Sequence, residues 1–278
     1  MHTAVITGGA GGMGLATARL MGADHRLVLL DLSQEALDAA VAELAASGLE
    51  ARGVAVDITD RAAVAEALQD VEAEAGVRAV VHAAGLSPSM GHPERIIRVN
   101  AIGTVNVAEA FAEVVPPGGA LVNVASVAGH MLPRVLIPRR VFWQVDTDPE
   151  ELAARLLKRA NRGPSGGRSG TAYSLSKAFV IWYSAHLAAR FGEREARVVS
   201  VSPGSFDTDM GRLEEGSGSA ALVEHGALKR FGGPEEIAAV LAFCASEAPG
   251  YLTGTDILCD GGVKAGMTLR AMIEMARA

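Results

Sequence analysis

Thr7-Gly-Gly-Ala-Gly-Gly-Met-Gly14 is the most informative stretch of this 278-residue chain. It follows the apolar run Ala4-Val5-Ile6, which is typical of a buried strand, and it leads into residues 15–20, which favour a helix. A strand, a glycine-rich turn and a helix form the cradle of a dinucleotide pyrophosphate, because glycines let the backbone approach the phosphates and the helix N-terminus presents free N–H groups. The spacing TGxxxGxG therefore predicts a dinucleotide site, against the alternative of a flexible loop. The residues expected there are Gly8, Gly12, Met13 and Gly14.

The composition indicates a large α/β domain and excludes some classes of function. Hydrophobic residues make up 49% of the chain and the mean hydropathy is +0.24. No apolar run reaches the ~20 residues that span a bilayer, and the N-terminus lacks the pattern of a signal peptide, so we expect a cytoplasmic protein without a membrane partner. The net charge of −7 argues against a nucleic-acid partner. Cys244 and Cys259 lie in apolar contexts typical of buried thiols, so we expect no disulfide and no metal.

Strand-like and helix-like segments alternate along the chain. Seven apolar runs predict strands, at residues 4–6, 26–31, 54–57, 77–82, 120–124, 197–201 and 255–259. Helices are expected at 33–47, from 59 or 60 to 76, and at 94–115, 173–191 and 234–246. This alternation predicts one domain over residues 1–278 with a doubly wound, Rossmann-type α/β fold. Its three layers would contain a mostly parallel sheet of about seven strands, with ligands bound at their carboxyl ends.

Residues 130–170 interrupt this rhythm, because they are too many for a plain connection. Their start is apolar, and they contain a helix signal in which Asp148 is the cap and Pro149 the first helical residue. The glycine-rich residues 163–170 return the chain. Two hypotheses stay open: a mobile cap over an apolar substrate, hinged at 163–170, or a packed extra helix or subunit interface. The tail after Gly262 is a short helix candidate without a clear role.

Four polar residues are expected to meet at the edge of the sheet that carries the glycine turn. Tyr173 and Lys177 stand four residues apart, on one face of a predicted helix. Ser126 follows the strand at 120–124, and Asn100 lies in the helix before it. A solvated surface pair is the alternative for Tyr173 and Lys177 considered in isolation.

Taken together, these motifs resemble the short-chain dehydrogenase/reductase family. The resemblance covers about residues 2–262, apart from 130–170. The enlarged segment between Ser126 and Tyr173 is similar to that of the bacterial 3α-hydroxysteroid dehydrogenase/carbonyl reductase type. The matching residues are Thr7-Gly8, Gly12, Gly14, Asp31, Asp57, the turn His82-Ala-Ala-Gly85, Asn100, Ser126, Tyr173, Lys177, Pro203-Gly204 and Thr208, with 231–238, 251–254 and 260–262 after them.

The resemblance implies a catalytic role for each of the four polar residues. Tyr173 would exchange a proton with the substrate oxygen, because Lys177 and an oxidised nicotinamide lower a phenol pKa that is otherwise near ~10. Ser126 would orient that oxygen, and Asn100 would hold a water that links Lys177 to solvent. The alternatives are a helix-kink residue for Asn100 and a turn hydroxyl for Ser126.

The choice of cofactor depends on Asp31, at the end of the second predicted strand. A carboxylate there accepts hydrogen bonds from the ribose 2′-hydroxyl and repels a 2′-phosphate, so we expect NAD rather than NADP. The alternative is that Asp31 only caps the following helix. The resemblance adds further cofactor contacts: Asp57, Ile58, Ala84, Gly85, Tyr173, Lys177, Pro203, Gly204, Phe206 and Thr208. A smaller aliphatic residue is usual at position 206, where a backbone contact is implied.

The expected function is NAD-dependent interconversion of a secondary alcohol and a ketone on an apolar, steroid- or terpenoid-like substrate. The apolar substrate is inferred from the composition of 130–170 alone. Two alternatives are a catalytically silent dinucleotide-binding regulator or scaffold, and a family member with another reaction, such as a dehydratase or epimerase. The resemblance also implies a homodimer or homotetramer.

Overall fold

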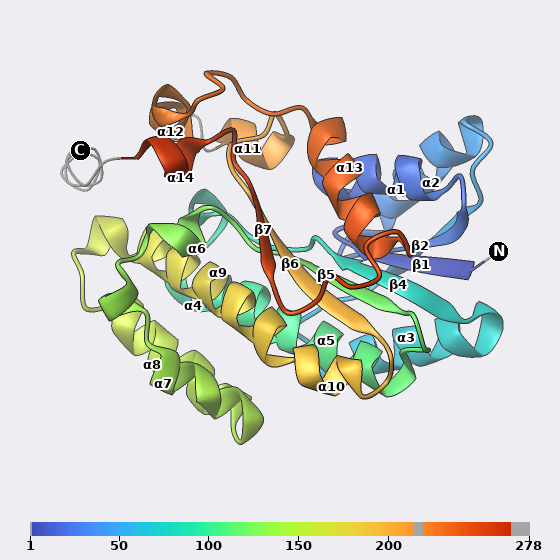
Figure 1. Ribbon diagram of the computed structural model, residues 1–278, viewed down its shortest axis with the longest axis horizontal. Coiled ribbons are helices and arrows are strands. Elements are labelled where there is room, and N and C mark those ends of the chain that lie inside the picture. The colour runs from blue at the N-terminus through green and yellow to red at the C-terminus, as the bar shows by residue number, and fades with distance from the viewer. Residues whose placement is uncertain (1, 214–218, 268–278) are drawn as a thin grey trace.

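Seven parallel strands form one sheet, in the order β3-β2-β1-β4-β5-β6-β7 (Figure 1). The computed structural model describes residues 2–213 and 219–267. The predicted Rossmann-type sheet is confirmed, and the strands that end in His82 and Val124 have the predicted bounds. The strands are β1 His2–Thr7, β2 His25–Asp31, β3 Ala51–Ala55, β4 Val77–His82, β5 Ala120–Val124, β6 Arg197–Pro203 and β7 Asp256–Cys259.

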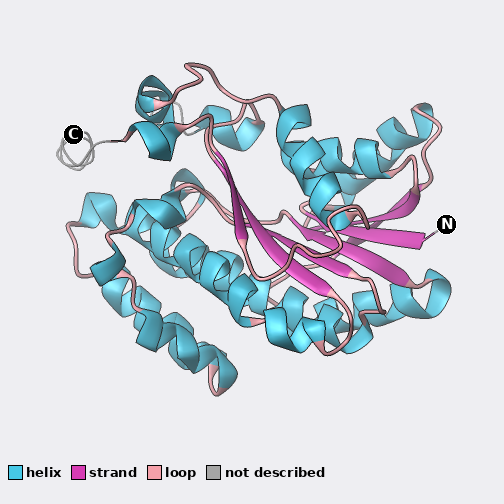
Figure 2. Cartoon of the chain, in the orientation of Figure 1, coloured by secondary structure: helices cyan, strands magenta, loops and turns pink. Residues whose placement is uncertain are grey.

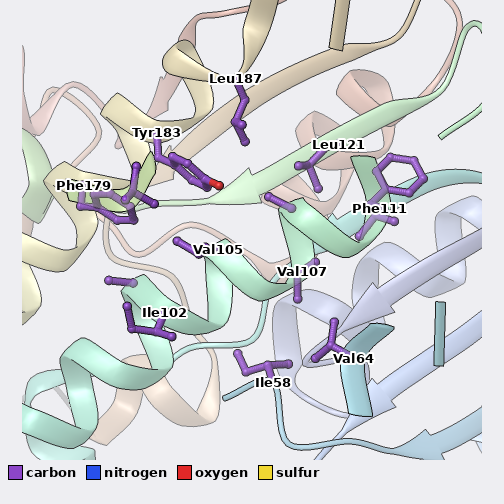
Figure 3. Packing of buried hydrophobic residues seen from close by; sticks show 14 of the residues in the cluster. Ile58, Val64, Ile102, Val105, Val107, Phe111, Leu121, Phe179, Tyr183 and Leu187 are labelled. Carbon is purple, nitrogen blue, oxygen red and sulfur yellow. The ribbon is translucent and has the colours of Figure 1, made fainter. Parts of the chain in front are cut away.

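Helices cover both faces of the sheet, as Figure 2 shows. One face carries α1 Gly12–Met21, α2 Gln34–Ala46 and α13 Pro234–Ala245, and the other carries α3 Arg61–Ala75, α5 Gly103–Val114 and α9 Arg168–His186. Each face buries its own hydrophobic core, and Figure 3 shows Phe111 of α5 with Phe179 and Tyr183 of α9 in one of them. The strand order reverses at β1, so the glycine turn after Thr7 lies where open α/β sheets bind ligands.

Local sequence signals explain where several helices begin. The Ser33 side chain accepts a hydrogen bond from Ala36 N at the start of α2, and Asp60 caps α3 in the same way. Asp148 accepts from Glu151 N and begins α8, Pro149–Ala160, as its position predicted. None of the helices within the described residues is long and apolar enough to cross a membrane.

Two predicted helices differ from the structure. The expected helix at 94–115 is divided into α4 Pro93–Ile97, a π-helical turn Arg98–Ile102 and α5. The helix that carries Tyr173 begins at Arg168, inside the predicted hinge. The hydroxyl of Ser169 donates to Gly91 O at 3.1 Å, and this long-range contact holds a turn that glycine content alone predicts as loop.

The segment 130–170 packs as an extra layer on the outer side of α9 (Figure 1). It contains α7 Arg139–Phe142 and α8, which follow α6 Ala128–Met131. Phe142 packs edge-on against Phe179 with ring centroids 5.4 Å apart, and Leu152 and Leu156 of α8 are fully buried. This arrangement favours the extra packed layer over the substrate cap. Of the tail, α14 Val263–Gly266 is described, and residues 268–278 lie outside the described residues.

Candidate active site

A cavity of about 640 Å³ opens at the carboxyl ends of the strands. This volume falls within the range of ligand pockets. Each residue that the sequence predicted for catalysis or cofactor binding lines the cavity, except Asn100, which is buried behind it. The predicted residues in the lining are Gly8, Gly12, Met13, Gly14, Asp31, Asp57, Ile58, Ala84, Gly85, Ser126, Tyr173, Lys177, Pro203, Gly204, Phe206 and Thr208.

The glycine turn is packed so closely that side chains would not fit. Gly8 has φ +65°, and a Cβ there would lie 2.8 Å from Ala84 N. A Cβ on Gly14 would lie 2.1 Å from the carbonyl oxygen of Gly8, and one on Gly12 would lie 3.0 Å from the Thr208 side chain. The turn therefore leaves its backbone open to the cavity at the start of α1, which fits a dinucleotide pyrophosphate.

Asp31 lies at the end of β2 and holds the glycine turn. Its Oδ2 accepts a hydrogen bond from Ala10 N at 3.2 Å, and its Oδ1 accepts one from Leu32 N at 2.8 Å. Because Ser33 caps α2, the alternative role of Asp31 as the helix cap is wrong. Asp57 forms a turn of its own, in which Oδ1 accepts from the amide and the hydroxyl of Thr59.

Tyr173 and Lys177 lie on the face of α9 that borders the cavity, together with Gly170 and Ser174. The Lys177 Nζ donates to Val124 O at 2.8 Å and lies 5.9 Å from the centroid of the Tyr173 ring. Burial lowers the pKa of Lys177 to about 8. The ammonium is therefore still charged at neutral pH, beside the phenol.

Asn100 is buried in the π-helical turn, with its amide fixed on both sides. Its Nδ2 donates to Leu86 O at 2.9 Å, and its Oδ1 accepts from Leu86 N at 2.8 Å. A Cβ on Gly85 would lie 3.2 Å from Asn100 Oδ1 and 3.4 Å from Lys177 Nζ, so the amide and the ammonium converge on this glycine. Asn100 thus lies in an irregular part of its helix, as the alternative of a helix-kink residue predicted, and it also lies close to Lys177.

Ser126 follows β5 and faces the cavity. Its Oγ accepts a hydrogen bond from Ala128 N at 3.2 Å, which is the local turn contact of the alternative interpretation. The hydroxyl proton is not used in that contact, and the residue also lines the cavity. Phe206 also lines the cavity, and its ring packs on Gly232, where a Cβ would lie 2.4 Å from the ring.

A buried network of hydrogen bonds, for which the sequence pattern indicated no role, joins the glycine turn to Asn100. The Thr104 hydroxyl donates to Asn100 O at 2.8 Å and so accepts from His82 Nε2, 3.1 Å away. His82 Nδ1 then accepts from the Thr7 hydroxyl at 2.7 Å, which in turn accepts from Ala84 N. Burial, followed by the charge of Lys177, lowers the pKa of His82 to about 3, so the imidazole is neutral. A histidine at the end of an apolar strand is the signal that could have indicated this network.

Comparisons with known proteins agree with this geometry. A family model described as short chain dehydrogenase matches residues 2–137, and one described as enoyl-(acyl carrier protein) reductase matches residues 161–264. A short-chain dehydrogenase/reductase of Alternaria brassicicola is 31% identical over 262 residues, which cover 92% of this chain and 94% of that protein. The chain belongs to the short-chain dehydrogenase/reductase family. Residues 138–160, between the two matched regions, lie in the extra layer.

Two further similarities extend over nearly the whole of this dehydrogenase/reductase. D-threitol dehydrogenase of Mycolicibacterium smegmatis is 31% identical over 271 residues, with 93% of this chain and 91% of that protein covered. A short chain dehydrogenase of Burkholderia cenocepacia, solved in complex with NADP, is 26% identical with a TM-score of 0.75, over 95% and 98% of the two chains. The protein is therefore an oxidoreductase of a family that binds a nicotinamide dinucleotide.

Proposed function

We propose that this protein uses NAD(H) to interconvert a secondary alcohol and a ketone on a largely apolar substrate. The observation that carries the proposal is that Tyr173 and Lys177, on one face of α9, line the same cavity as Ser126. A bound nicotinamide would supply or accept the hydride. The four polar residues would then have two tasks, to orient the substrate oxygen and to move its proton.

Tyr173 is the proposed general acid/base. In ketone reduction its hydroxyl donates a proton to the oxygen that becomes the alcohol, and in oxidation the phenolate takes that proton back. The buried Lys177 cation favours the phenolate, and Ser126 donates a hydrogen bond to the same substrate oxygen. Asn100 holds the backbone of Leu86 beside Lys177, at the point where a water would pass the proton to solvent.

NAD rather than NADP is the cofactor that Asp31 favours. Its carboxylate lines the cavity at the end of β2, where the ribose hydroxyls of the adenosine would lie. A 2′-phosphate would meet this negative charge. Leu32, the next residue, is exposed and carries no compensating cation.

The proposed substrate is apolar because of the cavity walls. The lining on the side of β4 and α4 includes Leu86, Pro88, Met90 and Val99, and Leu213 adds to it from α11, Asp209–Leu213. The apolar composition of the segment 130–170 no longer supports an apolar substrate, because no described residue between 129 and 169 lines the cavity. A steroid- or terpenoid-like alcohol fits such walls.

Replacing Tyr173 by phenylalanine tests the proposal. Tyr173→Phe removes the proton donor without changing the shape of the ring, so turnover of a secondary-alcohol panel should fall by at least ~10³-fold. The affinity for NADH, measured by its fluorescence, should stay within about twofold. Retained turnover would overturn the role of Tyr173, and a wild type that binds NADH but oxidises no alcohol would favour the regulator.

The proposal includes a cytoplasmic location and a homodimer or homotetramer. The exposed side chains of Val135, Leu136 and Trp143 on the extra layer support an oligomer. Light scattering after size exclusion would test this, and a monomer at micromolar concentration would contradict it.

A further inference from the structure

One of the charged side chains that line the cavity has no partner within the part of the chain that the structure describes. Asp31 and Asp57 accept backbone hydrogen bonds, Lys177 donates to Val124 O, and Asp209 pairs with Arg212. Arg95, on α4, also lines the cavity. Its guanidinium has no hydrogen-bond or ion-pair partner among residues 2–213 and 219–267. Arg95 is exposed to solvent at the rim of the cavity, so its guanidinium donors can be turned to a ligand that enters.

Contacts at the starts of two helices set the position of Arg95. Its aliphatic stem lies along Gly91, since a Cβ on that glycine would be 3.6 Å from Arg95 Cβ and Cδ. The same Gly91 accepts a hydrogen bond from Ser169 near the start of α9. Arg95 and Val99 lie one turn apart and both line the cavity, as do Gly170 and Ser174 of α9. Arg95 therefore lies about one helical turn further out than Tyr173.

Arg95 belongs to the substrate side of the cavity rather than to the adenosine side. The adenosine side lies at β2 and β3, where Ile58 packs so closely on Gly103 that a Cβ there would lie 2.6 Å from it. Arg95 precedes Gly103 by eight residues, which is roughly 12 Å along a helix axis. The helix α4 that carries Arg95 packs against α9, the helix of Tyr173, whereas Asp31 ends β2 and Leu32 follows it. Arg95 lines the cavity together with the apolar Met90 and Val99, its neighbours in sequence.

We infer that Arg95 binds a carboxylate at one end of the substrate, so that the substrate is an apolar hydroxy or keto acid. This inference rests on the proposed function and specifies its substrate class. The planar guanidinium matches a carboxylate with two parallel hydrogen bonds. The apolar walls hold the body of the molecule, and the carbinol or ketone carbon reaches Tyr173 one turn away. The anion fixes which end enters first, and hence which carbon meets the nicotinamide.

The test compares acids with their methyl esters in two series with different bodies. The probes are 6-hydroxydodecanoate and 4-(1-hydroxyethyl)benzoate, each with its methyl ester, because in both acids the carboxyl carbon lies about one helical turn (~5–6 Å) from the carbinol carbon. Binding to NADH-loaded enzyme is measured by calorimetry, and oxidation by NADH formation. The variants are Arg95→Gln and Arg95→Lys. Arg98→Gln is the matched control, because Arg98 is three residues away and pairs with Glu150 instead of lining the cavity.

The wild type should bind at least one acid about 10- to 100-fold more tightly than its ester. Arg95→Gln should remove this preference and leave the affinity for the ester unchanged, Arg95→Lys should restore part of it, and Arg98→Gln should have no effect. The inference fails if neither acid binds more tightly than its ester, or if Arg95→Gln weakens acid and ester equally. In either case turnover of a neutral alcohol would leave the proposed function intact, whereas no turnover of any alcohol would overturn that function as well.

Discussion

The hydroxyl of Thr7 lies 2.7 Å from Nδ1 of His82, in the interior of the sheet. Through Thr104, this pair connects the strand before the glycine turn to the backbone of Asn100. Thr7, His82, Thr104 and Asn100 are each less than a tenth exposed. None of their polar groups can therefore exchange its protein partner for water. The cofactor cradle and the proton-handling residues are therefore joined by hydrogen bonds as well as by packing.

His82→Leu should destabilise the fold by about 2–4 kcal/mol, because two buried threonine hydroxyls, those of Thr7 and Thr104, each lose one hydrogen-bond partner. Urea unfolding measures the change. His2→Leu, at an exposed position on β1, is the control and should stay within about 0.5 kcal/mol of the wild type. A loss below about 1 kcal/mol for His82→Leu would mean that the hydrogen-bond network of Thr7, His82 and Thr104 contributes little to stability.

The lowered pKa of His82 predicts that the stability of the protein depends on pH. The native pKa is about 3, below the ordinary 6.5, so between these values the unfolded chain binds a proton that the native state does not. The free energy of unfolding should therefore fall by about 1.4 kcal/mol per pH unit from this group as the pH decreases from 6.5 to 3. Urea titrations at several pH values should give a shallower slope for His82→Gln. Equal slopes would contradict a neutral, buried His82.

Lys177→Met should give a more stable but inactive enzyme. The native pKa of Lys177 is about 8 against 10.5 in the unfolded chain, so below pH 8 the native state bears the full cost of a buried cation. After subtracting the lost hydrogen bond to Val124 O, the variant should be about 2 kcal/mol more stable at pH 7. The advantage should disappear as the pH rises from 8 to 10.5, because the native lysine then loses its proton. A destabilised variant at pH 7 would show that the hydrogen bond outweighs burial.

Asp31→Ala should weaken the preference for NAD. Without the carboxylate, the ratio of kcat/KM for NADP to that for NAD should rise at least about tenfold. Since Asp31 also accepts from Ala10 N, the KM for both cofactors should rise somewhat as the glycine turn loosens. Asp38→Ala, on the exposed side of α2, is the control. An unchanged ratio would remove Asp31 as the determinant of cofactor choice.

Leu156→Ala tests the role of the extra layer. Leu156 is fully buried between α8 and its neighbours, so truncation should cost about 2–4 kcal/mol of stability. The KM for bulky and small alcohols should change by less than twofold, because no described residue of α8 lines the cavity. The exposed Lys158→Ala is the control. A KM that rises for bulky substrates only, with stability unchanged, would instead support a substrate cap.

The sequence predicted the sheet and the cavity well, because both depend on local signals. Apolar runs gave the strands ending at His82 and Val124, and the glycine spacing gave the turn that holds Ala84 close. The π-helical turn around Asn100 was not predicted, because shifted backbone hydrogen bonds leave the apolar periodicity nearly unchanged.

Long-range contacts account for the other differences. The first turn of α9 is held by Gly91, which is 78 residues away from Ser169 in the chain, so no local pattern could indicate it. Arg95 is a charged residue on a short helix, and in sequence it is indistinguishable from a surface arginine. Only the fold shows that it borders the cavity.

The amide of Asn100 donates to one backbone atom of Leu86 and accepts from the other. An aspartate of the same shape would turn one carboxylate oxygen toward the Leu86 carbonyl, and the two would repel. Position 100 therefore discriminates between two nearly isosteric side chains by charge and by the number of donors alone, and it accepts the amide.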